Sequence, residues 1–154
     1  MGDALVSLTT KDELDRLARL KEQAEAGGGE KRIQQQRVRG KLTARERISL
    51  LLDPGSFSEL GLLVSHRATD FGLAEQKYLG DAVVSGSGRI DGRPLFIYSQ
   101  DFTVFGGSIS EVVGQKVCQA MDMALTSGVP IIAIYDSGGA RIQEGVSSLS
   151  GVGE

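Results

Sequence analysis

The stretch Pro130-Ile-Ile-Ala-Ile-Tyr-Asp-Ser-Gly-Gly-Ala-Arg141 decides the fold, because a continuous apolar run leads directly into a pair of glycines. Such a run is typical of a parallel strand that is buried on both faces. The preceding segment opens with the cap pattern Ser108-Ile-Ser-Glu111 and keeps apolar residues at helical spacing until Gly128. We therefore predict a crossover unit of an α/β layer, with the glycine turn at the carboxyl end of its last strand.

A β-hairpin is predicted upstream of this unit. Two short β-leaning runs, 82–90 and 94–98, meet at Asp91-Gly92, which is the strongest signal for a two-residue hairpin turn. Together, the hairpin, the helix and the final strand predict the first part of an α/β domain over residues 54–154. Because Ser147 to Glu154 stops among glycines and serines after one crossover, and a sheet needs more strands, we expect the chain to be truncated.

Residues 10–53 predict a helical segment at the N-terminus. The patterns Thr10-Lys-Asp-Glu13 and Thr43-Ala-Arg-Glu46 each match a capping box, and apolar residues follow both at helical spacing. The first helix is expected to stop at three consecutive glycines, 27–29, and the later one at Asp53-Pro54-Gly55.

The bulk properties indicate one folded domain and exclude several classes of protein. The chain has 154 residues, a net charge of −3 and 40% hydrophobic residues. This balance gives no general attraction to nucleic acid or to an anionic membrane, and no segment approaches the ~18 apolar residues of a membrane span. The chain has one cysteine, Cys118, which cannot form an internal disulfide, and its N-terminus lacks the pattern of a signal peptide. We therefore expect a cytoplasmic protein.

The turn at Asp136 to Arg141 has two interpretations that composition alone leaves open. Paired glycines let backbone amides approach a phosphate or a developing oxyanion, but they also occur in ordinary turns. A nucleophilic Ser137 is disfavoured, because the only histidine, His66, would have to be its base in a chain with no sign of a disulfide-bearing β-barrel. We expect His66 at the surface or at a domain boundary.

Two further segments favour anion binding. Gly106 and Gly107 precede the predicted helix and could expose amides at its positive end, unless they only shape a loop that Phe102 and Phe105 anchor in the core. Residues 31–47 hold seven basic side chains and one acidic side chain, a local net charge of +6. This stretch suits phosphates, although a solvated helix face that also contacts other subunits explains it equally well.

The sequence shows neither a metal-ligand cluster nor a P-loop nor a dinucleotide fingerprint, so any chemistry is expected to depend on backbone amides and a cofactor. Several segments together resemble the acyl-CoA carboxyltransferase family, of the propionyl-CoA carboxylase β-subunit and methylmalonyl-CoA carboxyltransferase type. They are Arg39-Gly-Lys-Leu-Thr-Ala-Arg-Glu-Arg47, Leu50-Leu-Leu-Asp-Pro-Gly-Ser-Phe57, Gly80-Asp-Ala-Val-Val84, Ile90-Asp-Gly-Arg-Pro94, Ser99-Gln-Asp-Phe-Thr-Val-Phe-Gly-Gly-Ser108 and Asp136-Ser-Gly-Gly-Ala-Arg-Ile-Gln-Glu-Gly145.

This resemblance implies an incomplete crotonase-like domain of ββα units. It implies transfer of carboxylate from carboxybiotin to the α-carbon of a short acyl-CoA, with propionyl-CoA to methylmalonyl-CoA the leading reaction. Biotin would be carried by a separate protein or subunit, and no metal is implied in this chain. The implied partners are the biotin carboxylase and biotin carrier subunit and further copies of the carboxyltransferase subunit.

The resemblance also implies a set of acyl-CoA-binding residues. These are Ser137, Gly138, Gly139, Ala140 and Arg141 beside the thioester, Phe105, Gly106 and Gly107 beside the CoA cleft, and Lys41, Arg45 and Arg47 at the CoA phosphates. The glycines that hold the enolate oxygen are expected beyond Glu154, so no catalytic residue is assigned and the chain alone is expected to be inactive. The alternative is a non-catalytic truncated product that serves as an assembly or CoA-binding module.

Overall fold

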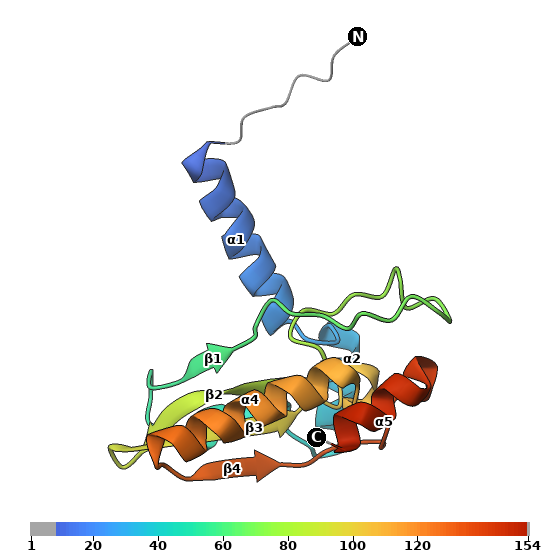
Figure 1. Cartoon of the computed structure of the whole chain (residues 1–154). Coiled ribbons are helices and arrows are strands. Elements are labelled where there is room, and N and C mark those ends of the chain that lie inside the picture. Colours follow the sequence, from blue (N-terminus) through green and yellow to red (C-terminus); the bar gives the residue numbers. More distant parts are fainter. Residues whose placement is uncertain (1–8, 154) are drawn as a thin grey trace.

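A computed structural model describes residues 9–153, which form a mixed α/β fold (Figure 1). The elements in chain order are α1 (Thr10–Glu25), α2 (Glu30–Val38), α3 (Ala44–Leu51), β1 (Ser58–Leu60), β2 (Val83–Ile90), β3 (Arg93–Gln100), α4 (Glu111–Ser127), β4 (Ile131–Ile134) and α5 (Val146–Gly153). Short 3₁₀ turns lie at Phe105–Gly107 and Ile142–Glu144. The strands form one sheet in the order β1-β2-β3-β4.

The predicted hairpin and crossover are both confirmed. β2 and β3 pair antiparallel from Val83 opposite Gln100 to Ile90 opposite Arg93. Asp91 and Gly92 turn the chain with φ angles of 49° and 74°, as the two-residue turn requires. β3 precedes α4 in the chain and β4 follows it. The two strands pair in parallel, so their carboxyl ends lie at the same edge of the sheet.

Each face of the sheet has its own core. On one face, Ala44, Ile48 and Leu52 from the α3 region pack on Ile97 and neighbouring residues of the hairpin. The other face is covered by α4, which runs along the sheet in Figure 1 and contributes Val113 to the second cluster. Alternate residues of β3 supply both clusters because side chains of a strand point to opposite faces. The N-terminal helical segment is therefore packed onto the sheet through α3.

Two of the predicted helix starts need correction, and one is confirmed. Thr43 and Glu46 form the expected capping box of α3, with reciprocal hydrogen bonds of 3.2 and 2.7 Å. The box of α1 is one residue earlier than predicted, at Thr9 and Asp12, since a shorter aspartate reaches the cap amide as well. The cap of α4 is Ser110 instead of Ser108.

Two other expectations were wrong. β4 is parallel as predicted but half exposed, because it lies at the edge of the sheet. His66 is buried, with its Nε2 2.8 Å from the carbonyl oxygen of Gln76. The glycine- and serine-rich end, for which the sequence predicted no element, forms α5, where Gly151 packs closely on Gly114 of α4.

The first helix, α1, extends away from the sheet as an arm (Figure 1). Its Leu14 is exposed, while Ala24 near its C-terminal end is buried against the body of the fold. Within residues 9–153, no helix combines the length and apolar character needed to cross a membrane.

Candidate functional site

The two glycine segments that the sequence singled out lie together at the edge where β3 and β4 end. We call them the Asp136 turn (residues 136–141) and the Gly106 turn (residues 100–108). The amide of Gly138 donates to the carbonyl oxygen of Gly106 at 2.9 Å. At Gly107, which has a φ of +65°, a Cβ atom would lie 2.0 Å from the carbonyl oxygen of Asp136, so this contact requires glycine.

A short parallel bridge continues this contact. Ile109 donates its amide to Gly139 O at 2.9 Å, and Arg141 donates its amide to Ile109 O at 2.8 Å. The residue between them, Ala140, therefore directs its own amide away from Ile109. Ser137, Gly138 and Gly139 are exposed, and the Ser137 hydroxyl accepts a hydrogen bond from the Gly139 amide at 3.0 Å. The Asp136 turn thus combines a fixed base with an accessible backbone.

Of the two interpretations of Gly106 and Gly107, the one that places them at the start of α4 does not hold. Their turn ends in Ser108, and the helix starts three residues later behind its Ser110 cap. The amide of Glu111 also donates to the side chain of Glu144 at 3.3 Å. Phe105 is an anchor, since it meets Tyr78 edge to face at a centroid distance of 5.2 Å. The alternative of a loop held by a core phenylalanine was therefore the better description of this segment.

Arg141 lies underneath the turn and does not face the surface. Its side chain is 0% exposed and pairs with Asp81, also 0% exposed, at 2.7 Å. It donates further to the Ser108 hydroxyl at 3.1 Å and to Glu144 at 3.1 Å. The guanidinium also lies over the Phe105 ring, 4.6 Å from its centroid. The guanidinium donors are thus used inside the fold, and the acyl-CoA contact that the sequence predicts for Arg141 stays a prediction.

The three basic residues predicted at the phosphates are divided between two places. Lys41 and Arg47 both pair with Asp136, at 2.6 and 2.7 Å, and so lie at the site. Arg45 instead makes a two-pronged ion pair with Glu59 of β1, at 2.6 and 3.0 Å. The structure therefore brings Lys41 and Arg47 to the Asp136 turn and leaves Arg45 with another partner.

Asp136 is the centre of this charge cluster. Its burial, the largest single influence, raises the pKa of the carboxyl, but the hydrogen bonds from Lys41 and Arg47 and their positive charges outweigh it and lower the pKa overall. The Asp136 amide also donates to the side chain of Gln100 at 3.1 Å. Asp136 is therefore an anion that joins the helical segment, the sheet and the glycine turns.

A groove of about 270 Å³ adjoins the Gly106 turn. It separates this turn from α2, and its lining includes two arginines, two phenylalanines and no carboxylate. The lining residues are Arg32, Gln35, Gln36, Arg39, Phe102, Thr103, Phe105 and Gly106. Lys41 borders it, with its Nζ 4.8 Å from the centroid of the Phe102 ring. The groove gives the site a positively charged, partly aromatic extension.

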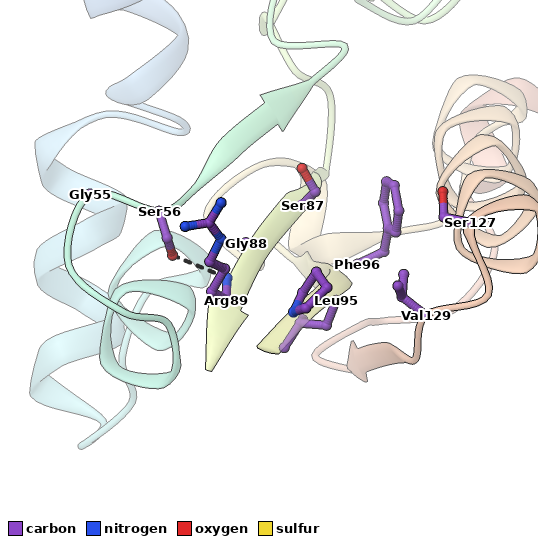
Figure 2. Close-up of a pocket in the computed structure, with 10 residues that line it drawn as sticks. Gly55, Ser56, Ser87, Gly88, Arg89, Leu95, Phe96, Ser127 and Val129 are labelled. Carbon is purple, nitrogen blue, oxygen red and sulfur yellow. Dashed lines mark hydrogen bonds between the residues drawn. The ribbon is translucent and has the colours of Figure 1, made fainter. Parts of the chain in front are cut away.

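A second cavity, of about 490 Å³, lies at the other end of the hairpin (Figure 2). Strand residues Ser87 to Arg89 and Leu95 to Phe96 line it, together with Ser56 and Val129. Arg89 is its single charged lining residue, and the Arg89 amide donates to the Ser56 hydroxyl at 3.1 Å. This cavity is remote from the glycine turns, which follow the opposite ends of β3 and β4.

Sequence reasoning missed the acidic partners of the site. Asp81 and Asp136 both stood in the quoted segments, but their pairing depends on arginines and lysines that are distant in the chain. Lys116 was also missed: it is buried and donates to the carbonyl oxygens of Gly80 and Val83 at 2.7 and 2.6 Å. Across the part of the chain that the structure describes, no group of three or more histidine, cysteine or acidic residues could hold a metal ion.

Comparison with known proteins defines the class. A model of the carboxyl transferase domain matches residues 35–154, so the chain belongs to the carboxyl transferase domain family. It is a homologue of propionyl-CoA carboxylase β chains: that of Roseobacter denitrificans is 58% identical over 144 residues, which cover 94% of this chain and 28% of the relative. The α subunit of methylmalonyl-CoA decarboxylase from Propionigenium modestum is 49% identical over 138 residues, which cover 90% of this chain and 27% of that subunit.

A solved structure agrees with these sequence matches. The crystal structure of transcarboxylase 12S, a hexamer with methylmalonyl-coenzyme A bound, superposes with a TM-score of 0.92 and 49% identity. The match covers 97% of this chain and 29% of that one. The chain thus spans between a quarter and a third of the length of these relatives.

Proposed function

We propose that this chain forms the acyl-CoA-binding part of the carboxyltransferase subunit of a biotin-dependent acyl-CoA carboxylase, with a crotonase-like fold. The observation that carries the proposal is the meeting of the Asp136 and Gly106 turns beside a basic groove. Propionyl-CoA is the proposed substrate, because the relatives named above include propionyl-CoA carboxylase β chains.

The geometry suits a thioester better than side-chain acid–base chemistry. The Gly138 and Gly139 amides donate to Gly106 O and to the Ser137 hydroxyl, so the Ser137 and Ala140 amides are the ones proposed to donate to the thioester carbonyl or to the oxyanion that develops from it. The base of the Asp136 turn is fixed by the bridge to Ile109 and by buried Arg141. Donors that are held in place before the reaction need no reorganisation when negative charge develops.

The phosphates of CoA would meet the positive side of the same site. Lys41 lies between the Asp136 turn and the Phe102 ring, and Arg32 and Arg39 line the adjoining groove. Arg45 and Arg141 are left out of the proposed ligand contacts, because Glu59 and Asp81 hold their guanidinium groups.

Biotin enters the proposal as a group carried by another subunit. When present, carboxybiotin would supply the carboxyl group, and we assign no residue of this chain to it. A biotin carboxylase and carrier subunit and further carboxyltransferase copies are the proposed partners, in the cytoplasm. The hexamer described for transcarboxylase 12S supports the assembly of several copies.

We further propose that the 154-residue polypeptide binds CoA but does not transfer carboxylate by itself. The test is to titrate the chain with CoA by calorimetry and to assay carboxyl transfer from free carboxybiotin to propionyl-CoA. Binding without turnover is expected. Turnover would overturn the proposed inactivity, whereas an absence of CoA binding would overturn the acyl-CoA site itself.

The alternative is a non-catalytic assembly or CoA-binding module. The observation that favours it is α1, which extends from the body with Leu14 exposed and so offers a surface for another subunit. Mixing the chain with the remaining part of a homologous carboxyltransferase subunit distinguishes the two proposed functions. Recovery of carboxyl transfer supports the enzyme, and binding without recovery supports the module.

A further inference from the structure

The Lys41 ammonium has hydrogen-bonding capacity beyond its ion pair. It donates to Asp136 Oδ1 at 2.6 Å, and its side chain is 40% exposed, whereas that of Asp136 is 10% exposed. An ammonium has three donors, so the contact with Asp136 leaves others available to solvent or to a ligand. Lys41 therefore reaches outward from an anchor that is itself nearly enclosed.

Arg47 has a different position in the same cluster. Its side chain is 19% exposed, and its Nη2 donates to Asp136 Oδ2 at 2.7 Å. The two oxygens of one carboxylate are thus occupied by two cations, of which Arg47 is the more enclosed. Together Lys41, Arg47 and Asp136 carry a net charge of +1, and Lys41 is the most exposed of the three.

A flexible lysine at a surface is ordinarily spread over many rotamers, and fixing it costs free energy when a ligand binds. Here the Lys41 Nζ atom is held by its ion pair with Asp136, and the centroid of the Phe102 ring lies 4.8 Å from the same atom. The site would therefore meet an anion with a cation that is already in place.

We propose that Asp136 is a positioning residue, which holds Lys41 at the mouth of the two glycine turns so that Lys41 can bind the phosphates of CoA. The inference rests on the proposed function, because it takes CoA as the ligand. It gives the three basic residues near the site separate roles. Lys41 contacts the ligand, Arg47 completes the enclosed part of the cluster and Arg45 belongs to the pair with Glu59.

The substitution Asp136→Asn gives a prediction whose sign is informative. Removing a negative charge beside an anionic ligand should by itself tighten binding. If Asp136 acts by positioning Lys41, the substitution instead weakens CoA binding, by about tenfold. Pantetheine, which has no phosphate, should bind the variant within about twofold of the unsubstituted chain, as measured by NMR titration.

A double-mutant cycle with Lys41→Met tests whether the effect passes through Lys41. In that background, Asp136→Asn should cause no further loss of CoA affinity, because the residue that it positions is already absent. Lys21→Met on the α1 arm and Asp122→Asn on α4, both at exposed positions, are the matched controls and should leave CoA affinity unchanged. Circular dichroism verifies that each variant is folded.

The outcomes divide clearly. Weaker CoA binding by Asp136→Asn, confined to the phosphate-bearing ligand and absent in the Lys41→Met background, supports the proposal. Unchanged or tighter CoA binding, an equal loss for pantetheine, or a full loss in the Lys41→Met background overturns it. If the unsubstituted chain binds no CoA at all, the proposed function fails and this inference fails with it.

Discussion

Replacing Arg141 by methionine should destabilise the fold severely. The change leaves the Asp81 carboxylate buried with the Ser110 hydroxyl, which donates to it at 2.7 Å, as its remaining side-chain donor. Removing one partner of a buried ion pair typically costs about 3–5 kcal/mol, because the other charge stays uncompensated. Domains are stable by only about 5–15 kcal/mol, so this is a large fraction of the total.

The measurement is urea unfolding followed by circular dichroism. With a denaturant dependence of about 2 kcal/mol per molar urea, the expected loss lowers the midpoint by about 1.5–2.5 M. Asp81→Asn and the double variant complete a cycle, and the double variant should be more stable than the sum of single effects predicts by at least about 1 kcal/mol. Arg67→Met is the control: its ion pair with Glu111 involves a side chain that is 70% exposed, and such pairs contribute only about 0–1 kcal/mol.

This prediction separates a structural from a ligand-binding role of Arg141. If Arg141→Met unfolded within about 1 kcal/mol of the unsubstituted chain and instead lost CoA affinity, the guanidinium would serve the ligand. The reasoning from burial would then be refuted. Additive single effects of Arg141→Met and Asp81→Asn would likewise contradict a direct pair.

Three further predictions can be checked by the same unfolding experiment. Gly107→Ala should cost more than about 2 kcal/mol of stability, because its Cβ would meet the Asp136 carbonyl. Gly92→Ala has open space around it and should cost only about 1 kcal/mol of strain at positive φ, so equal costs would contradict the close contact. Ser110→Ala removes both the cap of α4 and a donor to Asp81, so a loss of about 1–2 kcal/mol is expected, and no change would show that neither bond matters. Burial lowers the pKa of Lys116 from 10.5 to about 8, so between these pH values the unfolded chain binds more protons than the folded chain. The free energy of unfolding should therefore rise with pH over this range, and a Lys116→Met variant that keeps the same rise would exclude Lys116 as its source.

The sequence was sufficient for elements that local chemistry determines. The hairpin at Asp91-Gly92 needs positive φ at both residues, and the helix that ends at Gly128 needs a left-handed residue there, so each is recognisable from a few neighbouring positions. The cap of α4 was misplaced because Ser108 and Ser110 both fit the pattern locally. In the structure Ser110 caps the helix and also donates to buried Asp81, a contact that the local pattern does not show.

The burial errors have a different origin. The apolar residues from Ile131 to Ile134 indicated a strand covered on both faces, but burial depends on what lies beside a strand, and β4 is at the edge of this sheet. His66 was expected at the surface or at a domain boundary, since a lone histidine carries no pattern that shows its neighbours. Its partners, the Gln76 carbonyl and the Phe105 ring, come from loops with no periodic sequence.

The sequence predicted the segments of the candidate site but not the separate roles of its basic residues. Glycine pairs after strands predicted two turns, and both turns follow a strand of the sheet, the Gly106 turn after β3 and the Asp136 turn after β4. Basic residues alone do not reveal which of them are already paired, so Arg141 and Arg45 were grouped with Lys41. The distinction depends on Asp81, Glu59 and Asp136, whose ion pairs join segments that lie far apart in the chain.

The arrangement of these ion pairs explains how a glycine turn can be both exposed and rigid. The turn from Ser137 to Ala140 is anchored at one end by Asp136, through Lys41 and Arg47, and at the other by Arg141, through Asp81. Its middle gains flexibility from glycine, yet the bond from Gly138 to Gly106 O and the bridge to Ile109 limit that freedom. Because the Gly138 and Gly139 amides are used in internal bonds, the proposed stabilisation of an oxyanion would depend on the Ser137 and Ala140 amides, which the anchors hold in place. Loosening either anchor should therefore affect the turn even where the substituted residue touches no ligand.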